Sequence, residues 1–120
     1  MDIINRAQTE PFITKDGSQI RELLAYRNSS IRHQSLAEAT IAAGSATQEH
    51  YHPKSEEIYY ILSGSGRMKL NDEIREVGPL DAIAIPPGAH HKIWNTSDIP
   101  LVLLCCCAPP YENDDTVMLE

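Results

Sequence analysis

Short apolar segments separated by polar turns recur along the whole chain. Residues 67–70 and 73–77 alternate polar and apolar side chains, which is typical of half-exposed strands. Apolar runs at 58–62, 82–85 and 101–108 predict buried strands. The remaining predicted strands are 12–14, 19–26, 33–41, 50–52 and 91–95. About ten short strands without a convincing amphipathic helix predict an all-β barrel or sandwich.

The pattern of residues 19–26 fits two kinds of secondary structure. The apolar spacing within residues 19–26 suits a turn of helix, whereas Asp16-Gly17 between two short apolar runs is typical of a β-hairpin. We favour the hairpin, which places the N-terminal strands within residues 10–27.

Length and charge exclude several classes of protein. A chain of 120 residues, 42% of them hydrophobic, predicts a single domain over 1–120. Its net charge of -7, without a cluster of lysine or arginine, argues against a nucleic-acid partner. No apolar run approaches the ~20 residues of a membrane span, and the first residues do not resemble a secretion signal. We therefore expect a cytoplasmic protein with no membrane partner.

The three cysteines are consecutive, Cys105 to Cys107. This spacing matches neither the disulfide framework of a secreted domain nor a C-x-x-C zinc site. On a strand, Cys105 and Cys107 share one face and Cys106 takes the other. We interpret them as reduced, mostly small buried residues, and which of them reaches a pocket stays open.

Candidate metal chemistry begins at His50 and His52. Because one residue separates them, their side chains lie on the same face of an extended strand. Glu57 follows after a Pro-Lys-Ser turn, at the start of an apolar strand. Imidazoles and a carboxylate that face one space can bind a shared metal ion. A His-x-His pair by itself is weak evidence, since strand histidines are also common on surfaces.

A second histidine pair, His90 and His91, follows the turn at Pro86-Pro87-Gly88. With this segment the chain resembles the cupin superfamily of small β-barrels. The first cupin motif is matched in every spacing by Gly44, His50, His52, Glu57 and Gly64, and the second by Pro86, Gly88, His91 and Asn95. One position departs from the pattern, because Leu80 stands where the second motif usually opens with a glycine.

The resemblance implies a cupin jelly-roll barrel, a double-stranded β-helix, with its core at about residues 33–108 and a C-terminal tail at 109–120. It also implies one divalent transition metal per chain, Fe, Mn, Ni, Cu or Zn, bound by His50, His52, Glu57 and His91. Similar small cupins form dimers through edge or N-terminal strands, so a homodimer is expected.

The choice of acid and of further site residues rests on strand phase. Glu56 competes with Glu57, but Glu57 is in phase with Tyr59 and keeps the motif's spacing to its closing glycine. Tyr59 then points inward, either as a phenol that binds substrate or as a core tyrosine.

Two more residues are candidate catalytic groups. His90 is a candidate base beside His91 or a rim residue, and Arg21 is a candidate anchor for a carboxylate or phosphate, or one half of a surface ion pair. His33 is expected on a strand face without a ligand role.

The tail leaves the last strand through two prolines. Asp114 and Asp115 are expected in a solvated turn, and residues 117–119 are expected either to add an edge strand or to pack against a partner.

Two functions remain open from the sequence. The first is a mononuclear metalloenzyme acting on a small oxygenated molecule, either as a dioxygenase or as a Lewis-acid isomerase or decarboxylase of a sugar or organic acid. The alternative is a non-catalytic ligand-binding or sensing module with a structural metal. The complete ligand set favours the enzyme, and the expected partner is a small-molecule substrate.

Overall fold

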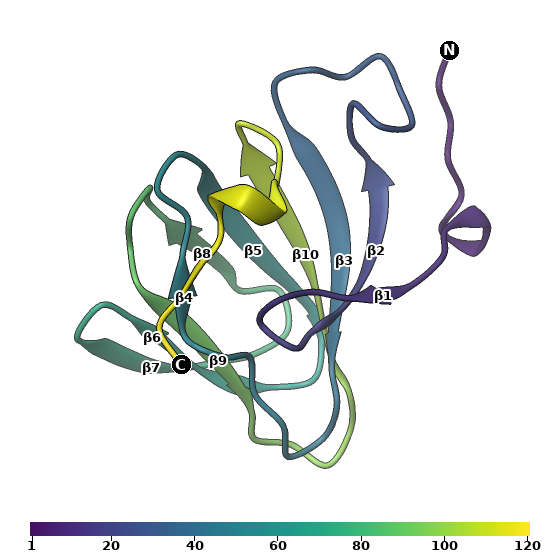
Figure 1. Ribbon diagram of the computed structural model, residues 1–120. Coiled ribbons are helices and arrows are strands. Elements are labelled where there is room, and N and C mark those ends of the chain that lie inside the picture. Colours follow the sequence, from purple (N-terminus) through teal and green to yellow (C-terminus); the bar gives the residue numbers. More distant parts are fainter.

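Two antiparallel β-sheets face each other around a shared core (Figure 1). The computed structural model describes all residues, 1–120. The six-stranded sheet has the order β1 (Phe12–Ile13), β2 (Gln19–Leu24), β3 (Ser35–Ile41), β10 (Leu101–Ala108), β5 (Glu56–Ser63), β8 (Ala82–Ile85). The five-stranded sheet has the order β11 (Val117–Met118), β4 (His50–Tyr51), β9 (His91–Asn95), β6 (Gly66–Leu70), β7 (Glu73–Val77). The helical elements are two 3-10 turns, η1 (Arg6–Gln8) and η2 (Asn113–Asp115). The predicted all-β fold is confirmed.

The ambiguous N-terminal segment is a strand. β2 pairs antiparallel with both β1 and β3, so the Asp16-Gly17 turn does close a hairpin. The tail adds an edge strand, because β11 pairs with β4 and places Met118 opposite His50. No helix in the structure has the length and apolar character needed to cross a bilayer.

The core lies between the sheets and follows the alternation of side chains along each strand. Ile61 of β5, Leu103 of β10 and Ile93 of β9 are fully buried in it. Ile58 and Leu62, which point the other way from β5, are 51% and 41% exposed. The inward face of β5 is therefore the face predicted from phase.

Strand register decides which functional side chains meet. On one sheet, Glu57 of β5 lies opposite Cys107 of β10. On the other sheet, His50 of β4 lies opposite His91 of β9. Since these strands project side chains between the sheets, residues distant in sequence face one space.

Two turn positions have special backbone requirements. Gly64 has a φ of +82°, and a Cβ there would lie 2.7 Å from the carbonyl oxygen of Pro100. Leu80 has a φ of +72° although it carries a side chain, and that side chain is 70% exposed. Leu80 therefore replaces the glycine of the cupin pattern, but its backbone keeps the positive-φ conformation that favours glycine.

Candidate metal centre

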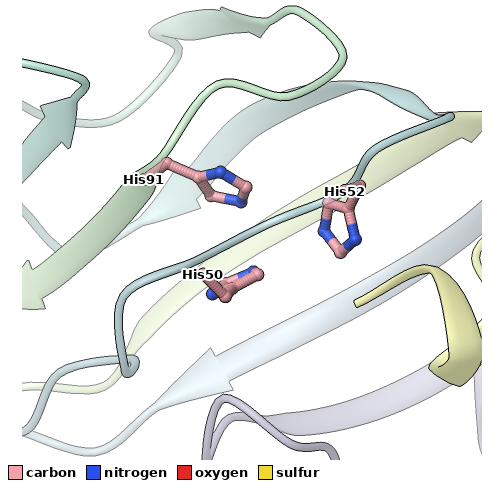
Figure 2. A group of neighbouring side chains, drawn as sticks. All are labelled: His50, His52 and His91. Atoms are coloured by element: carbon pink, nitrogen blue, oxygen red, sulfur yellow. The ribbon is translucent and has the colours of Figure 1, made fainter. Parts of the chain in front are cut away.

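Three buried histidines form the centre of the site. His50 lies in β4, His52 follows directly after that strand, and His91 begins β9. One ligand nitrogen from each ring lies within 4.8 Å of the other two. Figure 2 shows the rings gathered around a common space, with His50 and His52 on one segment and His91 on the neighbouring strand.

The backbone orients each of these rings. The Nδ1 atoms lie 2.8 Å from Gln48 O for His50, 3.1 Å from Asp115 O for His52 and 2.9 Å from Ala89 O for His91. A carbonyl oxygen only accepts hydrogen bonds, so each Nδ1 carries the proton and each Nε2 of the neutral ring has a free lone pair. Three electron-pair donors therefore face the same space, as in histidine metal sites.

Glu57 adjoins two of the three rings. Its Oε1 lies 3.4 Å from Nε2 of His52 and 3.4 Å from Nε2 of His91. Burial by itself would raise the pKa of Glu57, but hydrogen bonds and charge interactions with the protonated forms of His52 and His91 outweigh it and lower the pKa to about 2, and a cation bound in place of those protons would act in the same direction. The carboxyl group is therefore an anion at neutral pH although it is only 5% exposed.

The donor atoms fit a divalent cation. Oε1 of Glu57 and Nε2 of His91 are buried and have no hydrogen-bond partner. A buried polar atom without a partner costs about 1–3 kcal/mol, and more when it is charged. A metal ion would supply partners for both atoms, and three imidazoles with one carboxylate suit a first-row metal. Burial and the neighbouring His91 lower the pKa of His50, which favours the neutral ring that a metal requires, whereas for His52 burial is outweighed by the contact with Glu57, which raises the pKa of that ring.

A cavity of ≈ 50 Å³ lies beside these groups. Tyr59, Cys105 and Cys107 contribute to its lining, and Cys106 does not, as the predicted strand phases require. The Tyr59 ring meets the His91 ring edge-on, with centroids 5.9 Å apart. Burial raises the pKa of Cys107, so it remains a thiol, and its Sγ donates to Oε2 of Glu57 over 3.3 Å. This thiol holds the second oxygen of the carboxylate.

Comparison with known proteins identifies the family. Residues 37–107 match the family described as Cupin domain. The chain belongs to the cupin family. An uncharacterized protein of Methanocaldococcus jannaschii is 53% identical over 111 residues, which cover 92% of this cupin and 89% of the relative. The predicted resemblance is confirmed.

Solved structures with the same fold include named enzymes. The nucleoside dehydratase Pac13 of Streptomyces superposes with a TM-score of 0.82 at 18% identity, covering 100% of this cupin and 92% of that chain. The polyketide cyclase RemF of Streptomyces resistomycificus superposes with a TM-score of 0.83 at 23% identity, covering 100% and 86%. At these identities the likeness establishes the cupin fold.

Two candidate catalytic residues of this cupin lie away from the cavity. Arg21 projects from the other face of β2, and its Nη1 donates to Thr9 O over 2.6 Å. His90 is exposed, and its ring stacks on Tyr51 with centroids 4.9 Å apart. Neither residue lines the cavity. Their positions give no support to a catalytic role, whereas Tyr59 lies where such a role requires it.

Sequence reasoning was wrong about Asp115 and missed Asp16. Asp115 is 9% exposed, and its carboxylate accepts hydrogen bonds from the backbone N–H groups of Lys54 and Ser55, each over 3.1 Å. Asp16, in the hairpin turn, places Oδ2 3.7 Å from Nε2 of His50. The Asp-Gly signal predicted the turn at Asp16, but no local pattern shows that either aspartate reaches the site.

Proposed function

We propose that this cupin is a mononuclear metalloenzyme acting on a small oxygenated molecule. The observation that carries the proposal is the convergence of three imidazole lone pairs with a buried carboxylate oxygen that has no hydrogen-bond partner. In this proposal His50, His52, His91 and Glu57 hold one divalent first-row metal. The metal supplies Lewis-acid or redox chemistry when it is bound.

The protein's own groups support a reaction beside the metal. The cavity adjoins the donor atoms, so a substrate that enters it meets both the centre and the Tyr59 side chain. Four protein donors leave positions free on an ion that accepts six ligands. Buried surroundings strengthen electrostatic interactions with a reacting group and limit competing water. In this arrangement Tyr59 orients the substrate.

The relatives support an enzyme over a sensing module. Pac13 and RemF carry the names of enzymes that act on small molecules, and a protein named for tetracenomycin polyketide synthesis in Streptomyces glaucescens is 28% identical over 86 residues. The identity of the metal separates the two reaction classes. A redox metal favours the dioxygenase, and zinc favours isomerisation or decarboxylation.

Elemental analysis of the purified protein tests the site. Wild-type protein is expected to carry about one divalent metal per chain, and the double variant His50→Ala/His52→Ala is expected to carry none. His33→Ala is the matched control, because His33 is exposed and takes no part in the site. Full metal retention in the double variant would overturn the ligand assignment.

Turnover assays test the activity. Metal-loaded protein is screened for oxygen consumption with enediols and aromatic diols, and for conversion of sugars and organic acids without oxygen. Turnover that disappears in the double variant supports the enzyme. Tight metal binding without turnover in either screen would favour a binding or sensing module.

A further inference from the structure

The N-terminal hairpin brings a second carboxylate to the metal centre. Asp16 lies in the turn between β1 and β2, outside the residues that match the cupin family. Its Oδ1 accepts hydrogen bonds from Thr14 Oγ1 over 2.7 Å, Ser18 Oγ over 2.6 Å and Ser18 N over 2.9 Å. None of its hydrogen bonds involves Oδ2, which lies 3.7 Å from Nε2 of His50. One oxygen is therefore anchored, and the other faces a histidine nitrogen of the metal centre.

Glu57 is held in the same manner. Its Oε2 accepts a hydrogen bond from the Cys107 thiol over 3.3 Å. Its Oε1 has no hydrogen-bond partner and lies 3.4 Å from Nε2 of His52 and 3.4 Å from Nε2 of His91. Each carboxylate therefore has one fixed oxygen and one free oxygen. Between them, the two free oxygens approach all three imidazoles of the centre.

The distances suit donors that share one ion. Bonds from a first-row metal to nitrogen or oxygen are about 2.0–2.2 Å long, so two donors bound at angles of about 90–120° lie about 3–4 Å apart. The separations of 3.4 Å for Glu57 and 3.7 Å for Asp16 both lie in this range. A carboxylate oxygen and an imidazole lone pair repel each other unless a proton or a metal lies between them. The position of Asp16 against His50 is thus explained by a shared ion, as is that of Glu57.

The charges in the cavity also favour a divalent cation. Three carboxylates line it, and one of them, Glu22, is paired with Arg27 over 2.8 Å. Asp16 and Glu57 have no such partner, since no lysine or arginine lines the cavity. Two negative charges in a partly buried space cost free energy, and one divalent ion balances them. With three neutral imidazoles, such a site has no net charge when the ion is bound.

The hairpin turn is itself held in place. The backbone N–H of Gln48 donates to Asp16 O over 2.8 Å, which joins the turn to the segment that leads into β4. Nζ of Lys15 donates to Asn113 O over 3.0 Å and to Thr116 O over 3.2 Å, which joins the turn to the C-terminal segment. Because two other segments fix the turn, the Asp16 side chain is positioned before a metal binds.

We propose that Asp16 is a fifth protein ligand of the metal, bound through Oδ2 alongside Glu57 and the three histidines. This inference rests on the proposed metalloenzyme and specifies its metal site. Five protein donors leave one position on an ion that accepts six ligands, so the metal accepts one donor atom of a substrate at a time. Chelation of the metal by two atoms of a substrate is thereby excluded while Asp16 is bound.

Manganese(II) tests the inference, because this ion favours six ligands and its EPR and water-relaxation signals are measured without turnover. Asp16→Asn keeps an oxygen for the hydrogen bonds from Thr14 and Ser18, and it replaces Oδ2 by an amide group that only donates. We expect about one bound water per ion in wild type and about two in the variant, with manganese affinity at least ~10-fold lower. Asp72→Asn removes an exposed carboxylate and should change neither quantity.

The inference is overturned if wild-type protein holds about two waters per bound ion, or if Asp16→Asn leaves the water count unchanged. A lower affinity with an unchanged water count also overturns it, because Asp16 would then act on the metal only through its charge. Should the variant fail to fold, the wild-type water count still decides. Failure of wild-type protein to bind any divalent ion would refute the metalloenzyme, whereas normal binding with two waters refutes only the role of Asp16.

Discussion

Replacement of Asp115 by alanine is expected to weaken both the fold and the metal site. The carboxylate accepts hydrogen bonds from the backbone N–H groups of Lys54 and Ser55. Ser55 is 3% exposed, so its N–H would lose its acceptor without gaining water. A buried donor left in this way costs about 1–3 kcal/mol, and the N–H of exposed Lys54 costs less because water can replace the carboxylate. We expect Asp115→Ala to lower the free energy of unfolding by about 2–3 kcal/mol.

The same substitution is expected to lower metal affinity, because the backbone of Asp115 orients a metal ligand. The carbonyl oxygen of Asp115 accepts the hydrogen bond from Nδ1 of His52, and the side chain anchors the segment that carries this carbonyl. Loss of a group that orients a metal ligand typically lowers metal affinity 10–100-fold. Because alanine keeps the carbonyl itself, we expect the lower end, a roughly tenfold loss.

Urea denaturation and competition with a chelator measure the two effects. Asp115→Asn keeps one acceptor oxygen and should lose about half as much stability as Asp115→Ala. Asp114→Ala changes the exposed neighbour and should stay within ~0.5 kcal/mol of wild type. A loss below ~0.5 kcal/mol in Asp115→Ala, together with unchanged metal affinity, would refute the anchoring role of this carboxylate.

Three further predictions concern other parts of the molecule. Glu57→Gln is expected to lower metal affinity at least ~10-fold in chelator competition. The control Glu56→Gln changes an exposed neighbour and should leave metal affinity unchanged. Equal effects of the two variants would contradict the assignment of Glu57 as the metal ligand. Leu80→Gly is expected to raise the free energy of unfolding in urea by about 0.5–1 kcal/mol by relieving the positive φ, and Leu80→Ala should bring no gain because it keeps the Cβ. Light scattering is expected to give twice the 13.4 kDa chain mass for a homodimer, and a monomer mass at micromolar concentration would contradict that expectation.

Local patterns were enough to predict most strands and the inward face of β5. Alternation with period two depends only on neighbouring residues, so it predicted that Glu57 and Tyr59 point inward together, as their burial confirms. It also placed Cys105 and Cys107 on one face of β10 and Cys106 on the other, and the structure decides that the face of Cys105 and Cys107 lines the cavity. Period two also placed His50 and His52 on one strand face, whereas His91 was predicted as a third ligand from the resemblance to the cupin motifs.

Strand phase does not determine what lies across the barrel from a residue. Arg21 and His90 were candidate catalytic residues because of their chemical type, yet Arg21 lies on the outer face of β2 and His90 lies on the surface. The structure instead brings Asp16 to His50. Sequence separation between such partners is large, and nothing in either segment signals the other.

The amino-acid sequence by itself determined the all-β architecture and the match to the cupin motifs, because these depend on periodicity and on spacing within short segments, and the resemblance to the cupin family then implied the set of candidate metal ligands. Only the tertiary structure decided that the hairpin carboxylate of Asp16 faces the site and that Asp115 of the tail supports His52. Both contacts arise when separate segments pack against the barrel opening. Their positions depend on the packing of the whole chain, which no local pattern of polar and apolar residues records.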